Sequence, residues 1–227
     1  AASDVYKRQA MTYGEYMKGV VQGEKNILFV NMAWGLGLGI IIDGNLYYGK
    51  SGFSGEFGHF CMFENEVLCH CGKKGCLETE ASVSAFHRIL IERYREGSNT
   101  ILAGKLDSGE EISLGDLLEA VRKEDVLCID ILEKMGVNLG KGIAGLMNIF
   151  NPELVILGGT LSLAGEYISL PVKSAIRKYS LNLVNQDTEI KISKLGERAG
   201  AFGACLLSRS KLLGMIPVSY THLTLPT

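Results

Sequence analysis

The sequence predicts a layered α/β domain. A hairpin pattern with a glycine-containing turn comes first, and short apolar strand patterns then alternate with helical ones. The chain has 227 residues, 47% hydrophobic and 21% charged, which is ordinary for a globular protein. Its apolar runs are far shorter than the roughly 20 residues of a membrane-spanning helix. Collagen, coiled-coil and membrane classes are therefore not expected, and a net charge of −2 predicts no broad basic surface for nucleic acid.

The first strand patterns form a hairpin. The apolar run at 27–31 predicts a buried strand. Residues 36–42 and 46–49 read as two further strands, and they flank the short turn sequence Asp43-Gly44-Asn45. Two strand patterns on either side of such a turn predict a β-hairpin.

A glycine-rich stretch separates the hairpin from the first long helical pattern. Residues 50–76 show little periodicity, which predicts an ordered functional loop. At about 80–95, apolar residues recur at spacings of three and four, so we expect one helix there. Ser113 and Asp116 have the spacing of a capping box and predict another helix start.

The second half of the chain continues the alternation. A long helical pattern runs from about 125 to 150 and is stopped by Asn151-Pro152. Residues 154–157 are a short apolar run closed by Gly158-Gly159, which is typical of a central strand that ends in a tight turn. The last three patterns are a helix, a strand and a helix, at about 165–179, 189–193 and 197–213.

The two ends of the chain differ from its middle. Residues 1–9 and 217–227 show no useful helical or strand period and lead into no capped element. Both resemble peptides translated from sequencing adaptors, so we expect two non-native tails around a domain at 10–216. Frayed natural termini are the alternative.

Four metal-ligand residues cluster in the glycine-rich loop. His59, Cys69, Cys71 and Cys76 have the spacing H-x9-C-x-C-x4-C. Three thiolates and one imidazole make a complete tetrahedral set for Zn²⁺, with no position left for a metal-bound water. The sequence therefore predicts a structural zinc site, and a reduced cysteine-rich loop without metal is the alternative.

The remaining candidate ligands have other expected roles. His70 lies between two cysteines, so we expect its side chain to point away from the ion, and the spacing of Cys61 is less convenient. Cys128 and Cys205 occur in helical, apolar contexts and are expected to pack in the core. Six cysteines in a chain of this length argue against a disulfide framework, so a reducing, cytoplasmic location is expected.

Three motifs around this cluster resemble the ROK family (repressors, open reading frames and sugar kinases). They are GFSGEFGH at 52–59, CHCGKKGCLE at 69–78 and NPELVILGG at 151–159. The resemblance implies one lobe of a two-lobed actin-like ATPase (RNase H-like) fold, with a mixed sheet and flanking helices. It implies that 10–216 is the second lobe plus the returning C-terminal helix, and that the first lobe is largely missing apart from a helix near 10–22.

The resemblance also assigns sugar contacts. Glu56, His59 and Glu78 match positions that contact sugar hydroxyls in family members. Carboxylates accept strong hydrogen bonds from vicinal hydroxyls, and an imidazole can ligate zinc through one nitrogen while the other faces a sugar. Without the motif, solvated surface carboxylates would be the simpler reading of Glu56 and Glu78.

The nucleotide contacts of the family's kinases have partial matches here. Gly35 and Gly37 fall in the turn that reads G-T-G-x-G in those kinases, and Gly158 and Gly159 match the adenine-side turn. Trp34 stands at the position of the Thr whose hydroxyl meets ATP phosphate, which argues against phosphate binding. Tight sheet packing is the alternative explanation of Gly35 and Gly37.

Two functions from different classes follow from the resemblance. The first is the sugar-binding effector domain of a ROK transcriptional regulator, which would contact DNA only through a missing N-terminal region and form homo-oligomers. The alternative is part of an ATP-dependent hexose or N-acetylhexosamine kinase, which would need ATP and Mg²⁺. The kinase's general base would lie upstream, so no catalytic residue is expected in this chain. A fragment that binds nothing is the third possibility.

Overall fold

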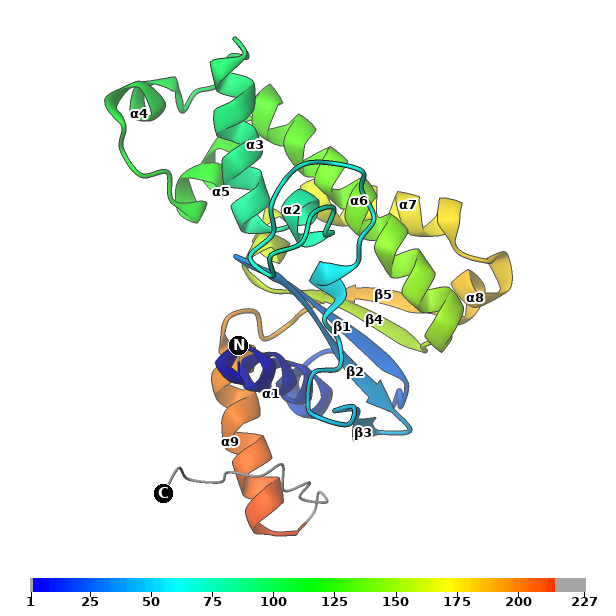
Figure 1. The fold of residues 1–227 in the computed structure, drawn as a ribbon. Helices are drawn as coiled ribbons and strands as arrows, with labels where there is room; N and C mark the ends of the chain where they lie inside the picture. The colour runs from blue at the N-terminus through cyan, green and yellow to red at the C-terminus, as the bar shows by residue number, and fades with distance from the viewer. Residues whose placement is uncertain (1, 215–227) are drawn as a thin grey trace.

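The computed structural model describes residues 2–214, with the backbone alone at 2–5 and 211, and contains a five-stranded mixed sheet (Figure 1). From edge to edge the strand order is β3-β2-β1-β4-β5. The strands are β1 Ile27–Met32, β2 Leu36–Ile42, β3 Asn45–Leu46, β4 Leu154–Gly158 and β5 Glu189–Ile192. The predicted α/β class and mixed sheet are confirmed.

Strand β1 lies at the centre because it is apolar on both faces. It pairs antiparallel with β2, where Ile27 lies opposite Ile41, and parallel with β4, where Leu28 lies opposite Val155. β5 extends the parallel half through the pair of Val155 with Ile190. The sheet is therefore antiparallel on the hairpin side and parallel on the other.

The hairpin turn forms as predicted, although the strand after it is short. Asp43 and Gly44 have φ of 50° and 78°, the left-handed backbone that a two-residue hairpin turn requires. β3 comprises Asn45–Leu46 rather than 46–49. Tyr47 donates one more hydrogen bond to the carbonyl of Ile40, at 2.9 Å, and the chain then leaves the sheet.

Helices cover both faces of the sheet (Figure 1). α6 and α7 lie across one face, and α1 and α9 lie against the other. The helices are α1 Ala2–Lys18, α2 Glu78–Ala81, α3 Val83–Arg95, α4 Ala103–Ser108, α5 Leu114–Arg122, α6 Val126–Phe150, α7 Glu166–Tyr179, α8 Asn182–Asp187 and α9 Arg198–Leu212, with the 3-10 turns η1 Phe57–His59 and η2 Thr160–Ala164.

Alternate residues of β1 contribute to two separate cores, as the period of a strand requires. Leu28 belongs to the large core that includes Leu139 of α6. Phe29 points the other way, into a smaller core with Met11 of α1 and Ala199 of α9. The sheet thus joins two helical layers of unequal size.

The long helix α6 begins and ends at the predicted signals. The Asp125 side chain accepts a hydrogen bond from the Cys128 amide, which caps the first turn. Asn151 takes a left-handed conformation with φ 42° and ends the helix just before the proline. A Cβ on Gly140 would lie 2.6 Å from the Cβ of Ala175, so glycine allows the close contact between α6 and α7. The Ser113 capping box of α5 is also confirmed.

The helix expected at about 80–95 is confirmed as α3, which begins at Val83 because Ser82 has an extended backbone and caps it with its side chain; the short helix α2 is separate from it. One expectation for helices was wrong. Residues 1–9 were expected to hold no regular element, yet α1 begins at Ala2 and the Arg8 side chain is buried. The origin of residues 1–9 stays a prediction, and the expected tail at 217–227 lies outside the described residues.

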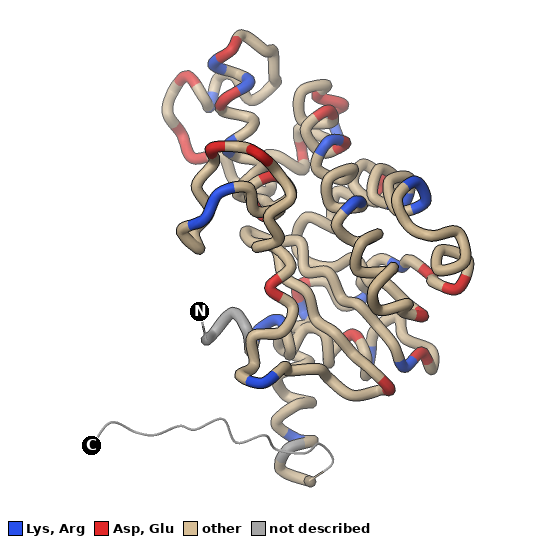
Figure 2. The backbone as a smooth tube through the Cα atoms, turned by 45° about the vertical axis from the view of Figure 1, so that its right-hand side comes forward, with Lys and Arg blue, Asp and Glu red and all other residues tan. Residues whose placement is uncertain are grey.

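Charged residues are dispersed over the described chain. Figure 2 shows Lys and Arg interspersed with Asp and Glu along the tube, as the net charge of −2 suggests. Of the helices that the structure describes, none combines the length and apolar character needed to cross a membrane.

Candidate functional site

The predicted metal ligands come together in the loop between β3 and α2. One ligand atom from each of His59, Cys69, Cys71 and Cys76 lies within 4.8 Å of the other three. The Cys69 Sγ lies 3.5 Å from the His59 Nδ1, and the Cys71 Sγ lies 3.6 Å from the Cys76 Sγ. A tetrahedral ion with bonds of about 2.0–2.3 Å has ligand atoms roughly 3.3–3.8 Å apart, so the four residues fit a metal ion.

Backbone turns bring the three thiols together. The Cys69 amide donates to the Lys73 carbonyl at 2.8 Å, and isolated bridges pair Leu68 with Lys74 and Cys61 with Cys76. Gly75 has φ of 76°, and a Cβ there would lie 2.2 Å from the Phe63 carbonyl oxygen. Glycine is required at that position because the turn is both left-handed and crowded.

The electrostatics of the thiols favour a bound cation. Burial, together with hydrogen bonds and charge repulsion from the neighbouring thiols Cys71 and Cys69, raises the pKa of Cys76 to about 12. Burial also raises the pKa of Cys69, whereas the backbone N–H of Lys73 lowers that of Cys71. Three adjacent sulfurs resist simultaneous ionisation because their charges repel, and a divalent ion would remove that repulsion.

His59 presents its two ring nitrogens to different partners. Its Nδ1 faces Cys69, and its Nε2 lies 3.8 Å from the Glu56 Oε2. The side chains of His59 and Glu56 are 33% and 40% exposed, so a ligand can reach both. The ring can therefore ligate a metal on one side and meet a ligand on the other, as expected.

The other histidine and cysteines follow the expectations with one exception. Among the described residues, His70 and Cys61 are exposed and lie outside the metal cluster, as expected. Cys128 is buried in the large core. Cys205 is exposed, so its predicted core role is wrong. α9 packs on α1 along a narrow stripe that includes Gly203, which leaves Cys205 on the open side.

Glu78 connects the metal cluster to strand β2. Its Oε2 accepts a hydrogen bond of 2.9 Å from the Leu36 amide, and its Oε1 lies 3.7 Å from the Cys69 Sγ. The predicted sugar contacts Glu56, His59 and Glu78 thus form one continuous chain of contacts through Cys69. The structure brings these three residues together, while their role toward a sugar stays a prediction.

The predicted nucleotide glycines lie in two places: Gly35 and Gly37 at or just before the start of β2, and Gly158 and Gly159 at the end of β4. A Cβ on Gly37 would lie 2.8 Å from the Arg8 Cδ, and one on Gly35 would lie 2.7 Å from the Glu78 Oε2. Both positions are therefore tightly packed, although against the side chains of Arg8 and Glu78 and not against a neighbouring strand as the alternative supposed. Gly158 lies opposite Asn31 at the end of β1, and Gly159 has φ of 82° beside the Met32 backbone. A nucleotide role for these glycines remains untested.

Trp34 occupies the turn between β1 and β2 and is 61% exposed. Its ring lies 5.5 Å from the His87 ring at an interplanar angle of 51°. The turn is fixed on α3 because the Val83 amide donates to the Ala33 carbonyl at 2.9 Å. Burial lowers the pKa of His87, which favours a neutral imidazole beside the indole. Trp34, which stands at the position expected to hold a Thr hydroxyl in the family's kinases, is therefore part of a large aromatic pair.

Sequence reasoning missed two arginines that contact this region. Arg8 donates to the Glu56 Oε1 at 2.8 Å, and it was missed because residues 1–9 were set aside. Arg88 donates to the Thr79 carbonyl at 2.7 Å, next to Glu78. Arg88 belongs to no short motif, and a position on the helical pattern at 80–95 does not by itself indicate a residue that contacts a functional site.

Comparisons with known proteins agree on one family. The model of the ROK family matches residues 4–211. A glucokinase of Halalkalibacterium halodurans is 36% identical, and the match covers 84% of this chain and 58% of that enzyme. A xylose repressor of Bacillus subtilis is 30% identical over 91% of this chain and 50% of the repressor. The chain thus spans about half the length of these curated relatives.

Solved structures of similar fold belong to the same family. A ROK family transcriptional regulator, homologue of the Escherichia coli MLC protein, superposes with a TM-score of 0.81 at 33% identity, covering 90% of this chain and 50% of the regulator. A ROK family glucokinase from Streptomyces griseus, in complex with glucose and AMPPNP, gives 0.80 at 30% identity, covering 90% and 67%. This regulator and this glucokinase are thus about equally similar to the chain.

Proposed function

Because this chain belongs to the ROK family and has the fold of a lobe of actin-like ATPases, we propose that it is the sugar-binding second lobe of a transcriptional regulator. The proposal includes one structural zinc ion in the cysteine cluster. Any DNA contact would be made by a segment outside this chain. The observation that carries the proposal is the chain of contacts from Glu56 through His59 and Cys69 to Glu78.

Sugar binding is supported by the chemistry of these groups. Two carboxylates and one ring nitrogen lie beside the metal cluster: the carboxylates can accept hydrogen bonds from sugar hydroxyls, and the ring N–H can donate one. The Streptomyces griseus structure was solved with glucose, which makes a hexose the first ligand to test.

A zinc ion would fix the orientation of His59. The residues that would hold it are His59, Cys69, Cys71 and Cys76. Four protein ligands complete a tetrahedral shell, so the ion would supply rigidity and neutralise the thiolates without activating a water. With Nδ1 on the metal, the Nε2 would keep its proton and donate toward Glu56 or a sugar hydroxyl.

Trp34 favours the regulator over the kinase. It offers no hydroxyl to a phosphate, and its large ring is exposed at the β1–β2 turn. Xylose repressors and an N-acetylglucosamine repressor are among the relatives. The kinase alternative is supported by two glucokinase relatives at 36% and 32% identity and by the Gly158-Gly159 turn.

Calorimetry on the intact protein tests sugar binding. Glucose, xylose and N-acetylglucosamine are titrated separately into the wild type and into the variants Glu56→Gln and Glu64→Gln. Glu64 is an exposed carboxylate in the same loop and serves as the matched control. We expect Glu56→Gln to weaken binding by about tenfold, since a charged acceptor is lost, and Glu64→Gln to have no effect. Failure of all three sugars to bind, or equal loss in both variants, would refute the assignment.

Phosphorylation assays separate the two functions. A regulator should bind its sugar without ATP and should form no sugar phosphate when ATP and Mg²⁺ are added. Turnover above the protein-free background would establish the kinase instead. The variant Trp34→Thr gives a second arm, because a kinase blocked only at this turn should gain ATP affinity.

A further inference from the structure

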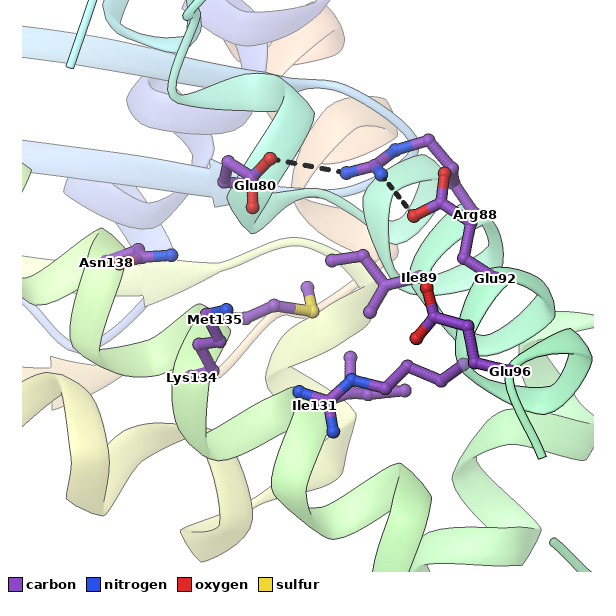
Figure 3. Close-up of a pocket in the computed structure, with 10 residues that line it drawn as sticks. Glu80, Arg88, Ile89, Glu92, Glu96, Ile131, Lys134, Met135 and Asn138 are labelled. Carbon is purple, nitrogen blue, oxygen red and sulfur yellow. Dashed lines mark hydrogen bonds and ion pairs between the residues drawn. The ribbon is translucent and has the colours of Figure 1, made fainter. Parts of the chain in front are cut away.

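Arg88 stands between two cavities on α3. A pocket of about 140 Å³ lies beside the cysteine cluster and is lined by Cys69, Glu78 and Arg88 among others. A second pocket of about 190 Å³ lies between α3 and α6 (Figure 3). Arg88 lines both pockets, so its side chain lies between the pocket beside the cysteine cluster and the pocket between α3 and α6.

The guanidinium of Arg88 makes three contacts. Its Nη2 donates to the Thr79 carbonyl at 2.7 Å. Figure 3 shows the other two contacts: Nη2 donates to the Glu80 Oε1 at 3.3 Å, and Nη1 donates to the Glu92 Oε2 at 2.6 Å. Asn65 donates to the same Glu80 oxygen at 2.9 Å. The Glu80 side chain is only 15% exposed, and Arg88 is 29% exposed, so these contacts are partly shielded from water.

Helix α2 depends on such contacts for its orientation. It comprises only Glu78–Ala81, and the extended backbone of Ser82 separates it from α3. A single helical turn is not stable by itself, because nucleation fixes several residues for one hydrogen bond. Arg88 holds the two residues that directly follow Glu78, and Glu78 in turn accepts the amide hydrogen of Leu36.

We propose that Arg88 is a positioning residue for sugar binding: it fixes α2 through Thr79 and Glu80, and thereby places the Glu78 carboxylate. This inference rests on the proposed sugar site and adds a residue that does not itself touch the sugar. Both contacts to α2 come from Nη2, while Nη1, the other arm of the planar fork, is bound to Glu92 on α3 and so orients the guanidinium. Lysine has the charge but no fork, so it can retain only part of this arrangement.

Four variants isolate the role of the guanidinium. Arg88→Met keeps most of the aliphatic stem and removes every donor, whereas Arg88→Lys keeps the charge. Glu92→Gln weakens only the outer contact, and Arg93→Met removes a neighbouring positive charge on the same helix. Each variant is first checked for melting temperature and zinc content, so that unfolding is recognised.

The first readout needs no sugar. The amide resonance of Leu36 in ¹⁵N-labelled protein reports the hydrogen bond to Glu78, and Glu78→Ala, which has no side-chain acceptor, supplies the reference for its loss. In Arg88→Met we expect this resonance to move toward its position in Glu78→Ala, with Arg88→Lys in between. In Glu92→Gln and Arg93→Met it should stay near the wild-type position.

The second readout is the glucose affinity of the intact protein by calorimetry, or that of whichever sugar the wild type binds. We expect Arg88→Met to lose about tenfold or more, Arg88→Lys to recover part of the loss, and both controls to stay within about twofold. An unchanged Leu36 resonance together with wild-type affinity in Arg88→Met would overturn the inference. If Arg88→Met does not fold, Arg88→Lys carries both readouts. If the wild type binds no sugar, the proposed function fails, while the Leu36 resonance still decides whether Arg88 places Glu78.

Discussion

The loop at 50–77 and the helical layer of α6 and α7 obtain their order in different ways. The layer buries many apolar side chains, such as Leu139 and Ile143, against the sheet. The loop contains one 3-10 turn and two isolated bridges, and its fixed centre is a set of four ligand atoms within 4.8 Å. Order in the layer is therefore spread over many contacts, whereas order in the loop depends on a few. Substitution of metal ligands should therefore disorder the loop, whereas truncation of a buried side chain in the layer should lower the free energy of unfolding.

The largest expected effect is loss of the metal. The double variant Cys71→Ser and Cys76→Ser should reduce bound zinc from about one ion per chain to nearly none, because structural zinc sites supply on the order of 10–16 kcal/mol. Metal analysis of the purified protein measures the content. Limited proteolysis should then cut within 60–75 and leave α6 intact.

The double variant Cys61→Ser and Cys128→Ser controls for removing two thiols outside the cluster. Retained zinc in that control is expected. A protease-resistant loop in the metal-free protein would contradict the contrast between the two regions.

A core truncation should damage the layer and spare the loop. Leu139→Ala removes a side chain that is fully buried in α6, and it should lower the free energy of unfolding by about 2–5 kcal/mol. Val126→Ala, on an exposed side chain of the same helix, should change it by less than about 0.5 kcal/mol. Denaturant titration measures both variants, and zinc content should remain that of the wild type. Zinc loss in folded Leu139→Ala would show that the two regions are not independent.

The junction between the regions can be probed at Gly142. A Cβ there would lie 2.8 Å from the Phe57 ring and 3.0 Å from the Leu77 side chain, which belong to the loop. Gly142→Ala should destabilise the protein by about 1–3 kcal/mol, because both neighbours are buried and must shift. Gly145→Ala adds a methyl group to open space on the same helix and should stabilise the protein by up to about 1 kcal/mol. Equal effects in the two variants would remove the argument for tight contact at this junction.

The smallest expected effect concerns α5, which lies outside both regions. Hydrogen bonds from Lys105 and Ser113 lower the pKa of Asp116 from 3.8 to about 2. Because the carboxylate form is favoured in the folded state, its contribution is present above pH 3.8 and is lost as the pH falls through about 2. Asp116→Asn should flatten this part of the stability profile, measured by denaturant titration at pH 2 to 5. An unchanged profile would contradict the role of the carboxylate.

The sequence predicted the sheet well because its strands have strong local signals. The apolar runs at 27–31 and 154–157 lie at the two central strands, where both faces are buried. The metal cluster was predictable because four ligands of the right chemistry fall within a short, glycine-rich stretch. Glu56 and Glu78 could be named only through the family resemblance, since nothing local distinguishes them from surface carboxylates.

Other features depend on tertiary contacts that a local pattern does not contain. The apolar spacing that predicts α3 begins at Val83, and it does not show that residues 78–81 form a separate short helix before the Ser82 cap. Arg88 and His87 look like ordinary helix residues until the fold places Thr79 and Trp34 beside them. The helix at Ala2–Lys18 was expected only from about residue 10, because residues 1–9 show no clear period and resemble a non-native tail; the contacts of this helix with β2 and α9 lie outside any local pattern.

The exposed Trp34 gives the protein a built-in optical probe. It is the single tryptophan of the chain, so selective excitation isolates the emission of one turn. Its ring is mostly exposed and lies 5.5 Å from the His87 ring, whose protonated form would quench the indole. The same turn leads directly into Leu36, which is hydrogen-bonded to Glu78. The emission intensity and wavelength of Trp34 should therefore respond to changes around Leu36 and Glu78, and no attached dye is needed.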